Sequence, residues 1–376
     1  MAGLYIHVPF CKKICSYCDF CKTALISLIP EYLKAIEKEL DSRKSYVRHE
    51  RLETLYLGGG TPSLLTPEQI SRIMSVIKDI YPVSPSCEIT FEANPEDLTP
   101  AYLEKLHAQT PVNRLSVGIQ SFNDSDLVFL NRRHNAQQAL HCIRHAREAG
   151  FENIGIDLIY GLPGMDTRRW QRNLDLAFAL EIKHLSAYHL SIEPGTAFSR
   201  MAKKGLLKVV AEEESANQFS VLHKAAIDNG FIHYEISNLA KEGYFSIHNT
   251  NYWKQKRYLG VGPSAHSYDL YSRRWNIPHV KHYLAAISAG REYAESEALG
   301  NTTRYNEFVM LSLRTMWGID LNRVRLEFGE PYYLDFLQHA RQSIASGHMV
   351  KEGEICRLTE KGWLISDYIV SGLMKD

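Results

Sequence analysis

A group of cysteines near the amino terminus has the residue types and spacing for metal chemistry. Cys11, Cys15 and Cys18 form a C-x3-C-x2-C array directly after a short apolar run. Three thiolates so close together can each bind one iron of a four-iron cubane, which leaves the fourth iron without a protein ligand and open to a small molecule. The array therefore predicts an iron–sulfur cluster with one reactive corner.

A structural zinc site is the alternative, because Cys21 could complete a set of four thiolates. Structural zinc usually takes its ligands as two separated pairs, and this array has no such pairs. The remaining cysteines stand singly at Cys87, Cys142 and Cys356. We expect these three to be buried small apolar residues rather than members of a disulfide framework.

Length and composition limit the kinds of protein that can carry this site. The chain has 376 residues, 45% of them hydrophobic, which is longer than one hydrophobic core usually supports, so two or more domains are expected. Lys plus Arg and Asp plus Glu each number 43, so no overall field attracts nucleic acid. The chain shows neither an apolar run of membrane-spanning length nor the layout of a signal peptide, which predicts a cytoplasmic protein.

Apolar runs alternate with amphipathic helical patterns in the first half of the chain, which predicts parallel strands joined by crossover helices. Thr66, Pro67 and Gln69 mark one helix start, and Gly150 ends a helix that begins at Ala136. Six units of this kind predict an α/β protein with a partial (β/α)6 barrel of the TIM type. The expected strands cover residues 4–8, 52–57, 87–91, 114–119, 154–160 and 184–191.

The alternation fades after about residue 202, where one helix over 212–229 precedes a region rich in Tyr, Trp, Asn and Gly. Residues 348–363 are typical of a short hairpin that leads into a last helix. A packing role is favoured over DNA binding for this C-terminal part, because it carries no basic stripe. We predict three parts: the partial barrel over 1–205, a segment capping the barrel over 206–285, and a mainly α, winged-helix-like domain over 286–376.

The cysteine array, with Tyr17 directly before its third cysteine, resembles the radical S-adenosylmethionine superfamily, whose members bind a 4Fe-4S cluster through this motif. The resemblance implies that the amino and carboxylate groups of S-adenosylmethionine chelate the open iron, and that an electron from the cluster can cleave the sulfonium to a 5'-deoxyadenosyl radical. The turn L-G-G-G-T-P-S follows the second predicted strand. It matches the superfamily motif that holds the methionine amino group, which gives Gly59, Gly60 and Thr61 that role.

Further polar residues stand at the ends of predicted strands, where the reactive groups of parallel barrels collect. They are Glu92 in T-F-E-A-N-P, Gln120 in G-I-Q-S-F and Asp157 in I-D-L-I-Y, and Arg132 lies nearby in L-N-R-R-H. A lone buried carboxylate is usually satisfied by a neighbouring amide. A set at successive strand ends can instead form a ring that hydrogen-bonds the ribose hydroxyls and methionine carboxylate of a bound nucleoside.

Longer motifs are similar to one branch of the superfamily, the oxygen-independent coproporphyrinogen dehydrogenases and their relatives. They are Y-I-H-V-P-F-C at the start, D-L-I-Y-G-L-P over 157–163 and Y-L-G-V-G-P-S-A-H-S over 258–267. By this resemblance Tyr5 and His266 are further S-adenosylmethionine contacts, although His266 is equally typical of a histidine in the core. The dehydrogenases carry a cysteine two residues after the third cluster cysteine, where this chain has Phe20, and an N-terminal extension that this chain does not show. Both departures weaken the dehydrogenase interpretation.

The chain instead resembles the HemW-type haem chaperones, which have Phe at that position and a H-N-x-x-Y-W motif, here H-N-T-N-Y-W over 248–253. The motif suits haem, because a neutral imidazole is the usual axial ligand of haem iron and aromatic rings can lie against the porphyrin. His248 is the candidate iron ligand, with Asn249, Tyr252 and Trp253 shaping the site. Without the resemblance, the same hexapeptide is typical of a loop that anchors the second segment on the barrel.

The sequence therefore predicts a haem chaperone that holds a 4Fe-4S cluster with S-adenosylmethionine and hands haem to an acceptor protein. An electron donor is a further expected partner, nucleic acid is not expected, and no catalytic residue is assigned. Peripheral membrane contact, the oligomeric state and the role of Cys21 are left open. Two alternatives are the dehydrogenase itself, which oxidatively decarboxylates a porphyrinogen, and a radical enzyme that modifies RNA, against which the zero net charge counts.

Overall fold

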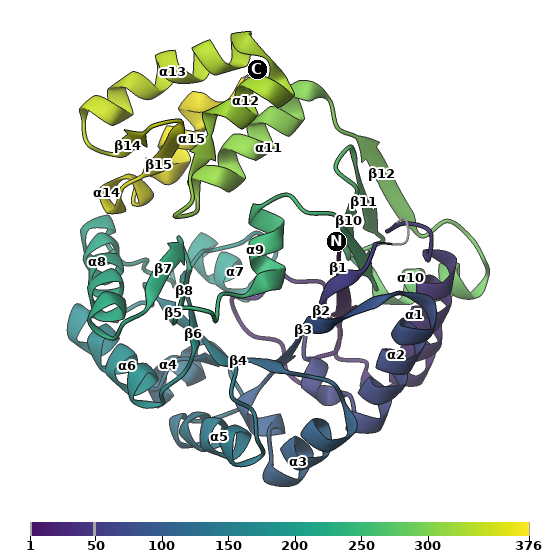
Figure 1. Ribbon diagram of the computed structural model, residues 1–376. Helices are drawn as coiled ribbons and strands as arrows, with labels where there is room; N and C mark the ends of the chain where they lie inside the picture. Colours follow the sequence, from purple (N-terminus) through teal and green to yellow (C-terminus); the bar gives the residue numbers. More distant parts are fainter. Residues whose placement is uncertain (1, 48–49, 376) are drawn as a thin grey trace.

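The computed structural model describes residues 2–47 and 50–375, and a partial barrel is its largest part (Figure 1). Six parallel strands, β1 to β6, lie in the sheet in the order of the sequence. The predicted α/β class and partial barrel are confirmed, and each expected strand is present with bounds that differ by a few residues. The strands are Ala2–Val8, Leu52–Gly59, Val83–Ala93, Arg114–Gln120, Ile154–Tyr160 and His184–His189.

Helices cover the outside of this curved sheet (Figure 1). α2 begins with the expected capping box, in which the Thr66 hydroxyl accepts from the Gln69 amide and the Gln69 side chain accepts from the Thr66 amide. Gly150 follows α5 with a φ of 98°, a left-handed conformation that glycine adopts without strain. The helices are α1 (Ile29–Ser42), α2 (Pro67–Ile80), α3 (Pro100–Gln109), α4 (Asp124–Phe129), α5 (Ala136–Glu148) and α6 (Thr167–Ala179), with 3-10 turns at Ile26–Leu28, Pro62–Leu64 and Pro95–Asp97.

The chain after β6 widens the same sheet at both edges. β7 (Ile232–Glu235) and β8 (Asn238–Ala240) extend the β6 edge, and β9 (Tyr258–Val261) pairs with β1 in parallel. β10 (His266–Tyr268), β11 (Ser272–Asn276) and β12 (Ala294–Ala298) follow antiparallel beyond β9. The helices of this region are α7 (Ala197–Lys203), α8 (Glu212–Asp228), α9 (Ile247–Trp253) and α10 (Val280–Ser288).

The C-terminal part is a group of helices with a small antiparallel sheet, and it lies beside the open end of the strand array (Figure 1). The Met316 amide donates to the Tyr234 carbonyl at 2.9 Å and joins this part to β7. The predicted hairpin is present as β14 (Met349–Glu352) and β15 (Ile355–Leu358), with β13 (Ile319–Asp320) beside it. The helices are α11 (Asn301–Leu313), α12 (Leu321–Phe328), α13 (Glu330–Ala345), α14 (Glu360–Trp363) and α15 (Ser366–Leu373).

The architecture agrees with the predicted winged-helix-like end of the chain, while the division at residues 205 and 285 stays a prediction. Within residues 2–47 and 50–375, no helix is long and apolar enough to cross a membrane.

Candidate functional site

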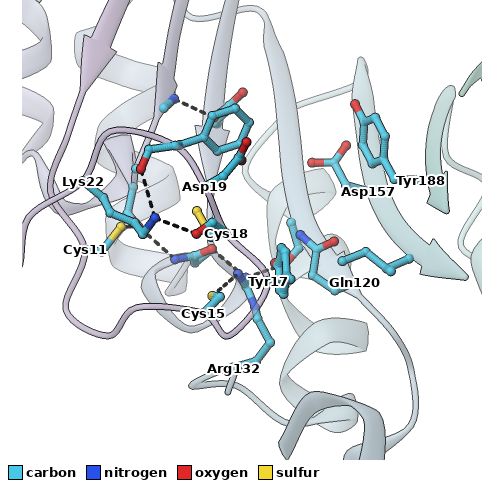
Figure 2. Close-up of a pocket in the computed structure, with 18 of the residues that line it drawn as sticks. Cys11, Cys15, Tyr17, Cys18, Asp19, Lys22, Gln120, Arg132, Asp157 and Tyr188 are labelled. Carbon is cyan, nitrogen blue, oxygen red and sulfur yellow. Dashed lines mark hydrogen bonds between the residues drawn. The ribbon is translucent and has the colours of Figure 1, made fainter. Parts of the chain in front are cut away.

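A cavity of about 350 Å³ lies at the carboxyl ends of the parallel strands (Figure 2). Loops and strand ends from β1 to β6 all contribute to its wall, as expected for the reactive edge of a parallel barrel. The predicted cluster cysteines line it together with most of the predicted nucleoside contacts. These residues are Cys11, Cys15, Cys18, Tyr17, Gly59, Gly60, Thr61, Glu92, Gln120, Arg132 and Asp157.

The three thiols are free and each has its own neighbours. The Thr61 hydroxyl donates to Cys11 Sγ at 3.6 Å, and Arg132 Nη1 lies 3.4 Å from Cys15 Sγ. Burial raises the pKa of Cys11 to about 11, although the Thr61 hydrogen bond acts against this rise. A buried thiol of this kind stays protonated until a metal displaces the proton, which couples metal binding to proton release.

The donor set fits a cluster better than a single ion. Among the described residues, no three His, Cys, Asp or Glu side chains group closely enough to hold one metal ion. Cys21 lies outside the cysteine cavity, and its Sγ donates to the Pro278 carbonyl at 3.3 Å. The four-thiolate zinc site is therefore not built here, whereas a cubane takes each thiolate on a different iron and suits thiols spread along one wall.

The glycine turn after β2 packs directly against the cysteine loop. A Cβ on Gly60 would lie 2.9 Å from backbone atoms of Pro9 and Phe10. Gly59 has a φ of 111°, and a Cβ there would meet the His7 ring at 2.6 Å. The two loops can meet only because this turn lacks side chains, as the sequence pattern indicates.

Two carboxylates face the same cavity. Glu92 accepts from the Tyr56 hydroxyl at 2.7 Å and from the Gly59 amide at 3.0 Å. Burial, and then the charge of Asp157, raise the pKa of Glu92 to about 7, although the two hydrogen bonds favour the charged form. Burial also raises the pKa of Asp157, which accepts from the Ser116 hydroxyl at 3.5 Å. A cationic or hydrogen-bond-donating ligand in the cavity would therefore stabilise the charged form of each carboxylate.

Arg132 joins three parts of the wall. Its Nη2 donates to Asn94 Oδ1 at 2.7 Å and to the Gly118 carbonyl at 2.6 Å, while Nη1 reaches Cys15 (Figure 2). Gln120 lines the same cavity as Tyr17 and has a φ of 68° where the pairing of β4 with β5 becomes irregular. A non-glycine residue held in this region is uncommon and clusters at ligand sites.

Two predicted S-adenosylmethionine contacts lie elsewhere. Tyr5 and His266 line a second cavity of about 600 Å³, on the other side of the chain that follows Cys18. Asp19 and Phe20 line both cavities and so form the wall that they share. The structure therefore does not bring Tyr5 and His266 into one cavity with Cys11, Cys15 and Cys18.

The H-N-T-N-Y-W segment makes up all of α9 except its first residue, Ile247, and His248 is fully buried. The Nδ1 atom of His248 bonds to the Thr54 hydroxyl at 2.7 Å, and Nε2 bonds to the Tyr252 hydroxyl at 2.8 Å. Burial lowers the pKa of His248 to about 3, so the ring is neutral, as an iron ligand must be. Both ring nitrogens are nevertheless engaged in hydrogen bonds in this arrangement, and the role of His248 as the haem-iron ligand stays a prediction.

The other residues of the motif differ in their surroundings. Tyr252 lines the second cavity, whereas Asn249 and Trp253 do not. The Asn249 amide donates to the Ser246 hydroxyl at 3.3 Å, which caps α9. The buried Nε1 of Trp253 has no hydrogen-bond partner among the described residues.

Sequence reasoning missed two residues of the cysteine cavity and its surroundings. Asn94, which positions Thr61 and Arg132, follows Glu92 in F-E-A-N-P, so the logic of polar residues at strand ends could have found it. Arg114 is 1% exposed inside the barrel, and its charge lowers the pKa of both Glu92 and Asp157 against the effect of burial. It stands at the first position of β4, where no local pattern distinguishes an inward side chain.

A parallel α/β barrel with a three-cysteine cavity at its carboxyl edge defines a radical S-adenosylmethionine protein. The sequence model of the Radical SAM superfamily matches residues 5–177, and that of the HemN C-terminal domain matches residues 299–365. This match confirms the expected cofactors of the fold, a 4Fe-4S cluster and S-adenosylmethionine.

Similar proteins extend over the whole chain. Heme chaperone HemW of Bacillus subtilis is 34% identical, with 100% of this chain and 99% of the relative covered. Heme chaperone HemW of Lactococcus lactis is 31% identical, with 99% and 97% covered. The chain belongs to the HemW family. Among solved structures, coproporphyrinogen III oxidase (HemN) from Escherichia coli has the same fold, with a TM-score of 0.86 and 24% identity over 100% of this chain and 90% of that one.

Proposed function

We propose that this protein is a cytoplasmic haem chaperone, which binds haem and passes it to an acceptor protein. The observation that carries the proposal is its similarity, over the full length of both chains, to proteins named heme chaperone at 31 to 34% identity. The partners are haem, the acceptor and an electron donor for the cluster.

In this proposal Cys11, Cys15 and Cys18 hold the 4Fe-4S cluster, and S-adenosylmethionine occupies the rest of the cysteine cavity. The cluster supplies an open iron for the amino and carboxylate groups of the ligand. Support comes from the free thiols on one wall and from the carboxylates, whose raised pKa favours a ligand that donates hydrogen bonds. The nucleoside contacts are those residues predicted from the sequence that line this cavity: Tyr17, Gly59, Gly60, Thr61, Glu92, Gln120, Arg132 and Asp157.

The α9 segment contributes to haem binding in the same proposal. Tyr252 reaches an aromatic cavity from this helix, and its hydroxyl is held by His248. A porphyrin needs broad apolar and aromatic surface, which the tyrosine and phenylalanine side chains of this cavity offer.

The dehydrogenase alternative fits the chain less well. Phe20 stands where those enzymes carry a further cysteine, and its side chain is 62% exposed on the wall between the two cavities. The structural likeness to the oxidase extends to the fold, and a shared fold does not fix the chemistry.

One anaerobic experiment tests the function. Protein reconstituted with iron and sulfide is titrated with haem, and the loaded protein is mixed with apomyoglobin as a general acceptor while the absorption spectrum reports transfer. We expect stoichiometric haem binding and transfer, and we expect the triple change Cys11→Ala, Cys15→Ala and Cys18→Ala to lose the cluster iron. No haem binding by the wild type, or conversion of coproporphyrinogen to protoporphyrinogen with S-adenosylmethionine and reductant, would refute the proposal.

A further inference from the structure

The second cavity is not lined by Cys11, Cys15 or Cys18, and it is suited to a large planar ligand. Its volume of about 600 Å³ is within the range of cofactor pockets, roughly 300 to 1,000 Å³. Residues from β1, the loop after Cys18, α9, the β9–β11 region and α11 meet in its wall. Its aromatic and apolar members are Tyr5, Phe20, Tyr252, Tyr258, Tyr268, Met310 and Leu311.

Of the two imidazoles in this wall, His266 is the available one. His7 bonds through Nδ1 to the Tyr5 hydroxyl at 3.0 Å and through Nε2 to the Cys21 carbonyl at 2.8 Å. His248, the ligand expected from the sequence motif, is engaged at both nitrogens behind Tyr252. His266 is exposed, and within the described residues its ring makes no hydrogen bond or ion pair, only a stacked contact with Trp275 at 6.1 Å between centroids.

The backbone holds His266 in place. It is the first residue of β10 and pairs with Trp275 of β11. A Cβ on Gly260 of β9 would lie 2.0 Å from the His266 carbonyl oxygen, so the missing side chain lets β10 approach β9 closely. An imidazole carried on a strand is positioned more rigidly than one on a loop, which suits a metal ligand.

We propose that haem binds in this second cavity with His266 as an axial ligand of its iron, and that His248 is a positioning residue that holds Tyr252 in the wall. The assignment rests on the proposed haem chaperone function and names the site within it. A neutral imidazole is the usual haem ligand, and Phe20, Tyr252, Tyr258 and Tyr268 supply ring surface for the porphyrin faces. Bound haem also covers Phe20, which explains a large apolar side chain left exposed in the free protein.

Other side chains of the wall are less suited to ligate the iron. Arg273 forms ion pairs with Glu307 at 2.5 Å and Glu297 at 3.6 Å, so it is already neutralised. The Cys21 thiol is committed to the Pro278 carbonyl, and Met310 is the remaining sulfur. The assignment therefore predicts histidine ligation, whose absorption and electron paramagnetic resonance signatures differ from those of ligation by sulfur or by a tyrosine of the same wall.

The test is haem titration of the reconstituted full chain in five forms: wild type, His266→Ala, His248→Ala, Cys21→Ser and, as a matched surface control, His339→Ala. We expect His266→Ala to lose the histidine signature of bound haem and to weaken haem binding by about tenfold or more. We expect His248→Ala to keep the signature with a smaller loss of affinity, and the Cys21 and His339 variants to match the wild type.

Chemical rescue separates ligation from a folding effect. A cavity made by His266→Gly should recover the wild-type spectrum when free imidazole is added, which a merely destabilised protein cannot do. A wild-type spectrum for His266→Ala, or loss of the histidine signature in His248→Ala alone, overturns the ligand assignment while leaving the chaperone function standing. Absence of haem binding by the wild type refutes the function itself.

Discussion

Replacing Glu92 by glutamine tests the electrostatics of the cysteine cavity. Glu92 holds its proton more tightly in the folded chain than in the unfolded one, because burial and the charge of Asp157 raise its pKa to about 7. Between about pH 4.5 and 7 the folded state therefore binds more protons than the unfolded state, and the free energy of unfolding falls as pH rises. Above pH 7 this loss of stability is complete. Glutamine at this position does not ionise, so it removes the pH dependence that Glu92 contributes.

The expected change in the free energy of unfolding follows from the rise in the pKa of Glu92. A rise from 4.5 to about 7 corresponds to about 3 kcal/mol at 1.36 kcal/mol per pKa unit. Glu92 borders an open cavity, so solvent screening reduces this value, and we expect about 1 to 2 kcal/mol. Glutamine keeps an acceptor for the Tyr56 hydroxyl but loses the bond from the Gly59 amide, which costs about 1 kcal/mol at every pH and cancels when two pH values are compared.

The assay is urea unfolding of the cofactor-free protein at pH 5.5 and pH 8. From the lower to the higher pH, the stability of Glu92→Gln relative to the wild type should improve by about 1 to 2 kcal/mol. Glu214→Gln is the control, because hydrogen bonds from the Gln218 and Thr167 side chains hold the pKa of Glu214 below its usual range, so that carboxylate is ionised at both pH values. If the free energy of unfolding of Glu92→Gln relative to the wild type is the same at both pH values, folding does not raise the pKa of Glu92 and the reasoning is refuted.

Three further changes probe the packing around the two cavities. Gly60→Ala places a Cβ 2.9 Å from the backbone of Pro9 and Phe10. We expect urea unfolding to show about 1 to 3 kcal/mol of destabilisation, and the reconstituted protein to hold less cluster iron. An unchanged iron content would contradict the close contact between the glycine turn and the cysteine loop. Thr54→Val leaves His248 Nδ1 without its partner and should cost about 1 to 3 kcal/mol, visible as a lower Tm; an unchanged Tm counts against the buried bond. Arg132→Lys replaces the guanidinium group that donates to Asn94 and to the Gly118 carbonyl. We expect calorimetry to show the affinity for S-adenosylmethionine reduced about tenfold, and an affinity equal to that of the wild type would contradict this role.

Local signals account for the parts of the fold that could be predicted. The six parallel strands follow from apolar runs bounded by helix starts, and the capping box at Thr66 forms as its sequence indicates. The hairpin at residues 349–358 likewise follows from alternating residues around a turn. Each of these features is decided within about ten residues of chain, where propensity and pattern act.

Long-range contacts decided what the sequence could not reveal. Tyr5 and His266 belong to the second cavity because β9 pairs in parallel with β1 and β10 folds back against β9, a pairing that joins distant segments. The hydrogen bond at Nδ1 of His248 comes from Thr54, which lies on β2, 194 residues away in the sequence. A motif fixes residue types and spacing, but the availability of a ring nitrogen depends on partners that spacing does not show.

The chain after Cys18 forms a wall that the two cavities share, so we expect a ligand in one cavity to affect binding in the other. Asp19 and Phe20 line both, and Lys22 holds this segment by donating to the Cys18 carbonyl at 2.6 Å and the Phe20 carbonyl at 3.0 Å. A cluster bound to Cys18 therefore constrains the backbone that forms the wall of the second cavity. By linkage, the factor by which the cluster changes affinity for a ligand there equals the factor by which that ligand changes cluster retention. If haem occupies the second cavity, its affinity measured by titration should differ between protein with and without the cluster, and equal affinities would contradict this coupling.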